Sequence, residues 1–168
     1  MKRVSAALGR ALLIWNLPTI AQQQPSCTGA QQAGTWTLQS WVAEDLETGQ
    51  KSNPFGERPN GYISYGPDCR MYAILVKDNR KAPAALVPTD AEKIDLYAGV
   101  IAYAGTYTLD GNKVSHHIDI SWNQVWTGTT QVREFKVEGN TLYIRAAPAK
   151  SPLTGRRTVF SLVYNKVE

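Results

Sequence analysis

The sequence contains little of what most enzymes and metalloproteins use. It has two histidines and two cysteines among 168 residues. It also lacks a Gly-x-Ser-x-Gly elbow, a His-Glu-x-x-His pair, a phosphate-cradling glycine loop and a Cys-x-x-Cys motif. Standard serine hydrolases, zinc proteases, nucleotide-binding proteins and thioredoxin-like enzymes therefore have no support, and we expect neither a metal ion nor another cofactor.

The net positive charge of the chain is small once the N-terminal residues 1–21 are set aside. Residues 1–21 indicate a secretory signal peptide, with Lys2, Arg3 and Arg10 flanking an apolar run that ends at Ala21. Its removal lowers the formal net charge from +4 to +1, because it carries three bases and no acid. A nucleic-acid-binding protein would keep a clustered basic surface, so we expect no nucleic-acid partner.

The rest of the chain has no run of membrane-spanning length, and the residues before Cys27 do not resemble a lipoprotein cleavage box. We therefore expect no stable membrane anchor and predict a secreted or periplasmic protein. Export makes a disulfide between Cys27 and Cys69 possible, and two unrelated thiols are the alternative. The sequence leaves both open, as it does the oligomeric state.

Residues 22–33 are rich in Gln, Gly and Ala and predict a flexible tail, and residues 34–168 are sized for one domain. Within that domain, short runs of β-branched and aromatic residues alternate with turn residues. The predicted strands are Thr35–Leu46, Gly61–Tyr65, Arg70–Lys77, Gly105–Leu109, Lys113–Ser121, Gln131–Glu138, Thr141–Ala147 and Thr158–Lys166. Asp110-Gly111-Asn112 and Glu138-Gly139-Asn140 predict tight hairpin turns.

One helix interrupts this pattern. Thr89 and Glu92 have the spacing of a capping box, and apolar residues then recur at helical spacing as far as Ala104, before Gly105. We expect this short helix to cover the end or a flank of the sheet. Eight antiparallel strands predict an all-β, up-and-down barrel able to hold one small ligand, with a packed sandwich as the alternative.

Several motifs carry a family resemblance. Gly34-Thr35-Trp36 resembles the Gly-x-Trp signature of the calycin superfamily, and the further motifs are Asn53-Pro54-Phe55-Gly56, Gly61-Tyr62-Ile63, Ala102–Tyr107, His116-His117, Ser121-Trp122-Asn123 and Gly128-Thr129. Over residues 33–166 the chain resembles the lipocalin-like domain family of bacteria and fungi. The resemblance implies a barrel with one closed end and an open mouth that binds a small hydrophobic molecule. Isomerases and cyclases also occur among lipocalin-like barrels.

The strand Lys113–Ser121 places Val114, His116, Ile118 and Ile120 on one face, which the apolar residues mark as the interior. His116 there either contacts a ligand or moves a proton, unless it is a core imidazole satisfied by a polar neighbour. His117 points the other way, so the two histidines cannot chelate one metal ion.

The strand Gln131–Glu138 brings Gln131 and Arg133 inside together with Phe135 and Val137. A buried guanidinium needs a partner: a ligand carboxylate, a protein acid or an aromatic ring. The calycin resemblance implies the last of these, a stack of Arg133, Arg145 or Arg157 on Trp36.

Aromatic residues with a polar tip suit a pocket for a ringed or amphiphilic molecule. The candidate ligand-binding residues are His116, Arg133, Gln131, Tyr72, Tyr103, Tyr107 and Trp122. We place Tyr72 on the interior face with Ile74 and Val76, and Trp122 at the barrel rim. The sequence thus predicts an exported barrel that binds a small hydrophobic or aromatic molecule. The alternative is an isomerase or cyclase with His116 as general acid or base.

Overall fold

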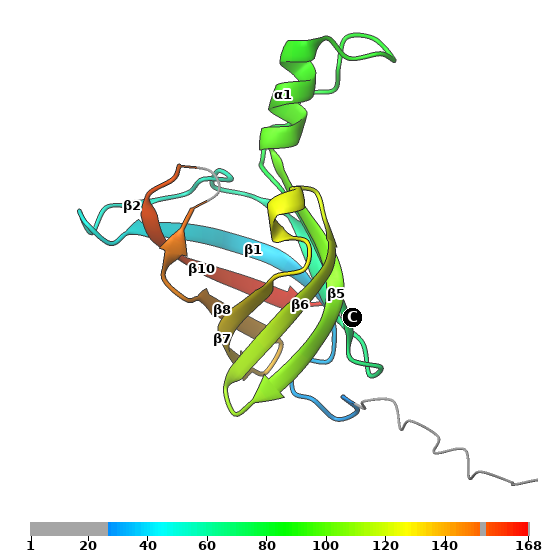
Figure 1. Cartoon of the computed structure of the whole chain (residues 1–168), viewed down its shortest axis with the longest axis vertical. Helices are drawn as coiled ribbons and strands as arrows, with labels where there is room; N and C mark the ends of the chain where they lie inside the picture. The colour runs from blue at the N-terminus through cyan, green and yellow to red at the C-terminus, as the bar shows by residue number, and fades with distance from the viewer. Residues whose placement is uncertain (1–26, 152–153, 168) are drawn as a thin grey trace, which may run out of the picture.

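Eight antiparallel strands close into a barrel in the computed structural model, which describes residues 27–151 and 154–167 (Figure 1). They are β1 (Gly34–Asp45), β3 (Asn60–Tyr65), β4 (Arg70–Val76), β5 (Val100–Asp110), β6 (Lys113–Ser121), β7 (Thr130–Glu138), β8 (Thr141–Ala146) and β10 (Arg157–Lys166). Each pairs with the next of these strands, and β1 pairs with β10 to close the barrel. The two-residue strands β2 (Lys51–Ser52) and β9 (Ala149–Lys150) add to β1 and β10. The predicted up-and-down barrel is confirmed, and the sandwich is wrong.

The two ends of the barrel differ in their connections. Successive strands run antiparallel, so the connections alternate between the ends. Short turns at residues 66–69, 111–112 and 139–140 lie at one end. Longer connections at 46–59, 77–99, 122–129 and 147–156 lie at the other, which we call the mouth. In Figure 1 helix α1 (Asp90–Ala98) and the 3₁₀ turn η1 (Gln124–Trp126) both lie at this mouth.

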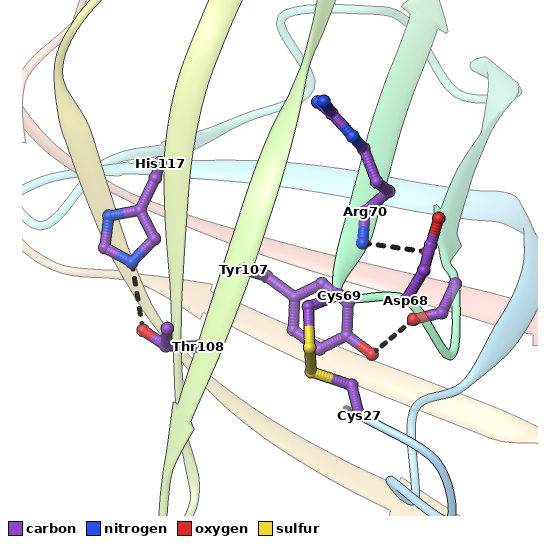
Figure 2. Close-up of a disulfide and its surroundings, with 8 residues drawn as sticks. Cys27, Asp68, Cys69, Arg70, Tyr107, Thr108 and His117 are labelled. Carbon is purple, nitrogen blue, oxygen red and sulfur yellow. Dashed lines mark hydrogen bonds between the residues drawn. A yellow bond between two sulfur atoms is a disulfide. The ribbon is translucent and has the colours of Figure 1, made fainter. Parts of the chain in front are cut away.

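A disulfide between Cys27 and Cys69 fastens residues 27–33 to the end with the short turns (Figure 2). The two Cα atoms lie 5.1 Å apart, and the Cys27 amide donates to the Pro67 carbonyl at 2.9 Å. Gln32 is fully buried, and its carbonyl accepts a 2.8 Å hydrogen bond from the Trp36 indole. This part of the predicted flexible tail is therefore folded onto the barrel. The predicted signal peptide, residues 1–21, lies outside the described residues.

Trp36 has a different cationic neighbour from the one expected. The Lys166 ammonium lies 5.3 Å from the centre of the Trp36 ring. The expected stack of Arg133, Arg145 or Arg157 on Trp36 is wrong, because the β1–β10 register places Lys166 opposite Trp36. The contact lies near the end of the barrel opposite the mouth, where β1 begins and β10 ends.

Helix α1 begins where the capping box predicts and ends earlier than expected. The Thr89 hydroxyl accepts from the Glu92 amide, and the Glu92 carboxylate accepts from the Thr89 amide. Gly99, not Gly105, ends the helix, since residues from Val100 onward form β5. The helix buries none of its residues and projects away from the barrel (Figure 1), so its expected covering role is wrong. No helix among the described residues has the length and apolar character needed to cross a membrane.

A bulge changes the facing of β6 near its end. Ala104 pairs with Ile120 whereas Gly105 pairs with Ile118, so Asp119 is an extra residue on β6. Val114, His116 and Ile118 are buried as predicted, but Ile120 is 66% exposed on the outer wall. The prediction of Ile120 in the interior is therefore wrong. Its physical reason is the inserted residue, which reverses the alternation beyond it.

Gly105 lies on β5 beside the bulge, where a Cβ would come within 1.9 Å of the His117 carbonyl oxygen. We expect Gly105→Ala to lower the free energy of unfolding by about 1–3 kcal/mol, because backbone atoms must move apart. Urea unfolding measures the change. Gly99→Ala is the control, since its nearest neighbours are flexible atoms of Lys77 and its backbone angles are ordinary. Equal costs for the two variants would contradict this account of the bulge.

Candidate functional site

A cavity of about 150 Å³ lies inside the barrel and opens at the mouth. All eight barrel strands contribute to its lining, and Ala147, Ala149 and Lys150 lie at its entrance. The walls are mostly apolar, with Trp41, Phe160 and Leu162 among the residues that line it. A cavity of this size admits a group of about one aromatic ring.

His116 lies inside the barrel at the polar part of this cavity, as predicted, and is 1% exposed. Its two ring nitrogens are both occupied by tyrosines from other strands. The Tyr65 hydroxyl lies 2.8 Å from Nε2, and the Tyr103 hydroxyl lies 3.2 Å from Nδ1. His116 thus has polar neighbours at both ring nitrogens, as the core-imidazole alternative expects. It also lines the cavity.

Burial keeps this chain of three side chains neutral. Loss of hydration lowers the pKa of His116 well below its ordinary value, and electrostatic interactions with Arg133 and then His117 lower that pKa further. Burial also raises the pKa of Tyr103, and that of Tyr65 well above its ordinary value. At neutral pH the imidazole is uncharged and both phenols keep their protons.

The positions of the protons follow from hydrogen-bond accounting. A neutral imidazole has one donor and one acceptor nitrogen, so one tyrosine donates to His116 and the other accepts from it. The Tyr65 hydroxyl is buried, and within the described residues Nε2 is the acceptor in reach. We therefore assign the Tyr65 proton to Nε2, which leaves Nδ1–H to donate to Tyr103. The Tyr103 hydroxyl keeps its own proton for the cavity, which Tyr103 lines and Tyr65 does not.

Arg133 and Gln131 project from β7 into the cavity, half-buried beside Phe135 and Val137, so their predicted inward facing is confirmed. The Arg133 guanidinium donates to the Val132 carbonyl at 3.0 Å and to the Gln131 side-chain oxygen at 3.5 Å. In residues 27–151 and 154–167, no carboxylate lies within 4.0 Å of it and no aromatic ring faces it. Neither the protein acid nor the aromatic ring considered for this cation is therefore present among the described residues.

Tyr72 does not line the cavity. On β4 the buried residues are Met71, Ala73 and Leu75, whereas Tyr72 is 44% exposed and Ile74 49% exposed. The prediction of Tyr72 in the interior is wrong, because β4 is apolar on both faces and its composition does not reveal which face is inner. Tyr72 and Ile74 instead form an apolar groove on the outer wall with Ile120 and Trp122.

Two further predicted residues lie near the cavity without lining it. The Tyr107 ring is buried towards the closed end, where its hydroxyl donates to the Gly66 carbonyl at 2.9 Å (Figure 2). Trp122 is half-buried and packs against Trp126 with ring centres 5.0 Å apart. Trp126 itself lines the cavity and packs edge-on against Tyr103. Trp122 therefore lies at the mouth, in the connection after β6, and Trp126 is the tryptophan of that connection that lines the cavity.

Tyr65, Trp41 and Tyr164 are among the residues at the cavity that the sequence analysis did not identify. Trp41 and Tyr164 line it, and the buried Trp41 indole N–H has no hydrogen-bond partner among the described residues. Tyr65 supports His116 from behind. Their inward facing follows from strand alternation with Ala43 on β1, Ile63 on β3 and Leu162 on β10. The alternation of inward and outward residues along each strand could therefore have identified these three as inward-facing.

His117 points outward and is held by two threonines. Its ring nitrogens lie 3.0 Å from the Thr108 hydroxyl (Figure 2) and 3.0 Å from the Thr130 hydroxyl. In the described part of the chain, no three His, Cys, Asp or Glu side chains are grouped so that they could hold a metal ion.

A family model described as Lipocalin-like domain matches residues 33–167, which include all eight barrel strands. The comparison with curated proteins found no match.

Proposed function

Because the chain belongs to the lipocalin-like domain family, whose barrel is suited to holding a ligand, we propose that it binds a small, mostly apolar molecule in its cavity. The observation that carries the proposal is an apolar cavity with a few polar groups gathered at one place, which are His116, Tyr103, Gln131 and Arg133. Such a combination is typical of ligand pockets, since apolar walls supply affinity and convergent polar groups fix orientation.

The size of the cavity favours a ring-sized ligand over a long acyl chain. Pockets for drug-sized molecules measure about 300–1,000 Å³, whereas this cavity measures about 150 Å³. The aromatic rings of Trp41, Trp126 and Tyr103 offer faces and edges against which one flat ring can pack. We infer a ligand with one ring and at least one oxygen that accepts hydrogen bonds.

The geometry favours binding over the isomerase or cyclase alternative. That alternative requires His116 to exchange a proton with a substrate, but both of its ring nitrogens are bonded to Tyr65 and Tyr103. Among the described residues that line the cavity there is no carboxylate to act as a base in its place. We therefore do not propose a catalytic role for His116.

The Cys27–Cys69 disulfide supports the proposal that the protein is exported, to the periplasm or outside the cell. Disulfides form and persist in oxidising compartments and are rare in the cytosol. The signal peptide predicted at residues 1–21 supports the same destination.

Filling the cavity tests the proposed function. We expect wild-type protein to bind benzyl alcohol, a neutral ring with one oxygen, and Ala146→Phe to weaken that binding about tenfold or more, because Ala146 lines the cavity. Quenching of tryptophan fluorescence measures the affinity, since Trp41 and Trp126 line the same cavity.

The matched control is Ala102→Phe, which adds the same ring to the outer groove beside Ile74. It should bind benzyl alcohol as the wild type does. Equal affinity in the Ala146→Phe and Ala102→Phe proteins, or no binding of any single-ring probe by the wild type, would overturn the proposed function.

A further inference from the structure

The polar part of the cavity contains a hydrogen-bond donor, the Tyr103 hydroxyl, and a positive charge, the Arg133 guanidinium. No carboxylate among the described residues lies within 4.0 Å of that guanidinium. The Tyr103 hydroxyl keeps a proton for the cavity, because His116 Nδ1 donates to its oxygen. The Arg133 guanidinium has a main-chain carbonyl and the Gln131 amide oxygen as acceptors, both uncharged. A half-buried cation without a counter-charge costs free energy that a bound anion would recover.

We propose that the cavity selects a small monocarboxylate built on one ring, whose carboxylate accepts hydrogen bonds from the Tyr103 hydroxyl and the Arg133 guanidinium. This inference rests on the proposed function of small-molecule binding. A guanidinium presents parallel N–H groups that match the two oxygens of a carboxylate. The apolar walls formed by Ile144, Leu162 and Phe160 then receive the ring.

The charge of the cavity indicates a single negative charge on the ligand. Its ionisable lining residues are His116, Tyr103, Tyr164, Arg133 and, at the entrance, Lys150. Burial keeps His116 uncharged, and it raises the pKa of both tyrosines, so they stay protonated. Arg133 is thus the one charged group among the described lining residues other than Lys150 at the entrance, and it balances a carboxylate better than a doubly charged phosphate ester.

Tyr65 and His116 act as positioning residues for Tyr103. With the tautomer assigned above, Tyr65 donates to His116 Nε2, and Nδ1 is then the donor towards Tyr103. The hydroxyl proton of Tyr103 therefore has no acceptor on His116 and is available to the ligand. Without this chain, Tyr103 would donate to the imidazole and would present only an oxygen lone pair to the cavity.

Calorimetric titration with benzoate and benzamide tests the inference, because the two probes have the same ring and shape and differ in charge. We expect wild-type protein to bind benzoate about tenfold or more tightly than benzamide, since hydrogen bonds to an ionised acceptor are about twice as strong. Arg133→Gln should remove this preference, so that benzoate binds no more tightly than benzamide. Tyr103→Phe, which deletes only a hydroxyl, should reduce the benzoate preference several-fold.

The matched control is Arg145→Gln, which removes the same charge from the exposed outer face of β8 and should keep the full preference. Equal affinities of the wild type for benzoate and benzamide would overturn the inference while leaving the proposed function standing. A preference that persists in Arg133→Gln would also overturn it. Failure of benzoate, benzamide and benzyl alcohol alike to bind would overturn the proposed function as well.

Discussion

Replacing both Cys27 and Cys69 with serine is expected to lower the free energy of unfolding by about 4 kcal/mol. The disulfide closes a loop of 42 residues in sequence, which contains the whole of β1 and β3. Freeing that loop raises the conformational entropy of the unfolded chain. The folded chain also loses the attachment of residues 27–33 to the closed end, where Gln32 receives the Trp36 hydrogen bond. Urea unfolding of the wild-type and double-serine proteins measures the difference.

Two controls accompany this variant. Wild-type protein unfolded in the presence of a thiol reductant should lose stability by a similar amount, since the same loop is opened. Affinity for benzyl alcohol at a temperature where both proteins are folded should be unchanged, because the cavity opens at the opposite end of the barrel. A stability loss below about 1 kcal/mol would contradict the structural role that we give to the bridge.

Stability should fall as the pH drops below 6.5, through His116. The folded pKa of this residue is well below its ordinary value of 6.5, chiefly because of burial and further because of Arg133. Between those two values the unfolded chain binds a proton that the folded chain does not, so acid favours unfolding. Above pH 6.5 neither state is protonated, and this contribution to stability is complete. Below it, the free energy of unfolding should fall by about 1.4 kcal/mol per pH unit until the folded pKa is reached.

Urea unfolding at several values between pH 7.5 and 5 measures this slope. That range lies above the ordinary pKa values of Asp45 and Glu92, whose pKa values the fold also lowers and whose contributions are lost only in stronger acid. His116→Gln should flatten the slope. His117→Gln, which removes the outward-facing histidine, should keep it. The same slope in the wild-type and His116→Gln proteins would mean that another group titrates.

The sequence predicts which side chains face the barrel interior only where apolar and polar residues alternate clearly along a strand. On β7, charged or polar residues occupy every outward position except Val132, so the inward facing of Arg133 and Phe135 could be predicted. On β4 every residue from Met71 to Val76 is apolar, and alternation cannot say which set is inner. That ambiguity placed Tyr72 on the wrong face. On β6 the alternation held until the bulge, which depends on the close approach of Gly105 to another strand.

For helix α1, the local sequence predicts the first residue correctly but not the last. Its start depends on Thr89 and Glu92, which interact across a single turn and are readable from spacing. The spacing of Val100, Ile101 and Ala104 predicts a helix that continues to Ala104. In the structure these residues belong to β5, where Ile101 and Tyr103 are buried at alternate positions. Residues 100–104 form a strand rather than a helix because they pair with β4 and β6. Pairing between strands distant in sequence cannot be recognised from the local sequence.

The candidate site was partly predictable for the same reason. His116 and Arg133 are conspicuous because each is a polar residue on the inner face of an otherwise apolar stretch. Tyr65 is not, since a buried tyrosine at a strand end is common, and its bond to His116 joins residues 51 positions apart. The unpaired state of the Arg133 guanidinium, on which the ligand proposal depends, emerges only when every neighbouring strand is placed.

The most direct test of the account is a crystal structure of the protein soaked with 4-bromobenzoate, in which anomalous scattering locates the bromine without ambiguity. We expect one bromine peak inside the barrel, with the carboxylate within hydrogen-bond distance of Tyr103 and Arg133 and the ring among Trp41, Trp126 and Phe160. An empty cavity, or a bromine peak confined to the outer groove beside Tyr72 and Ile120, would contradict it.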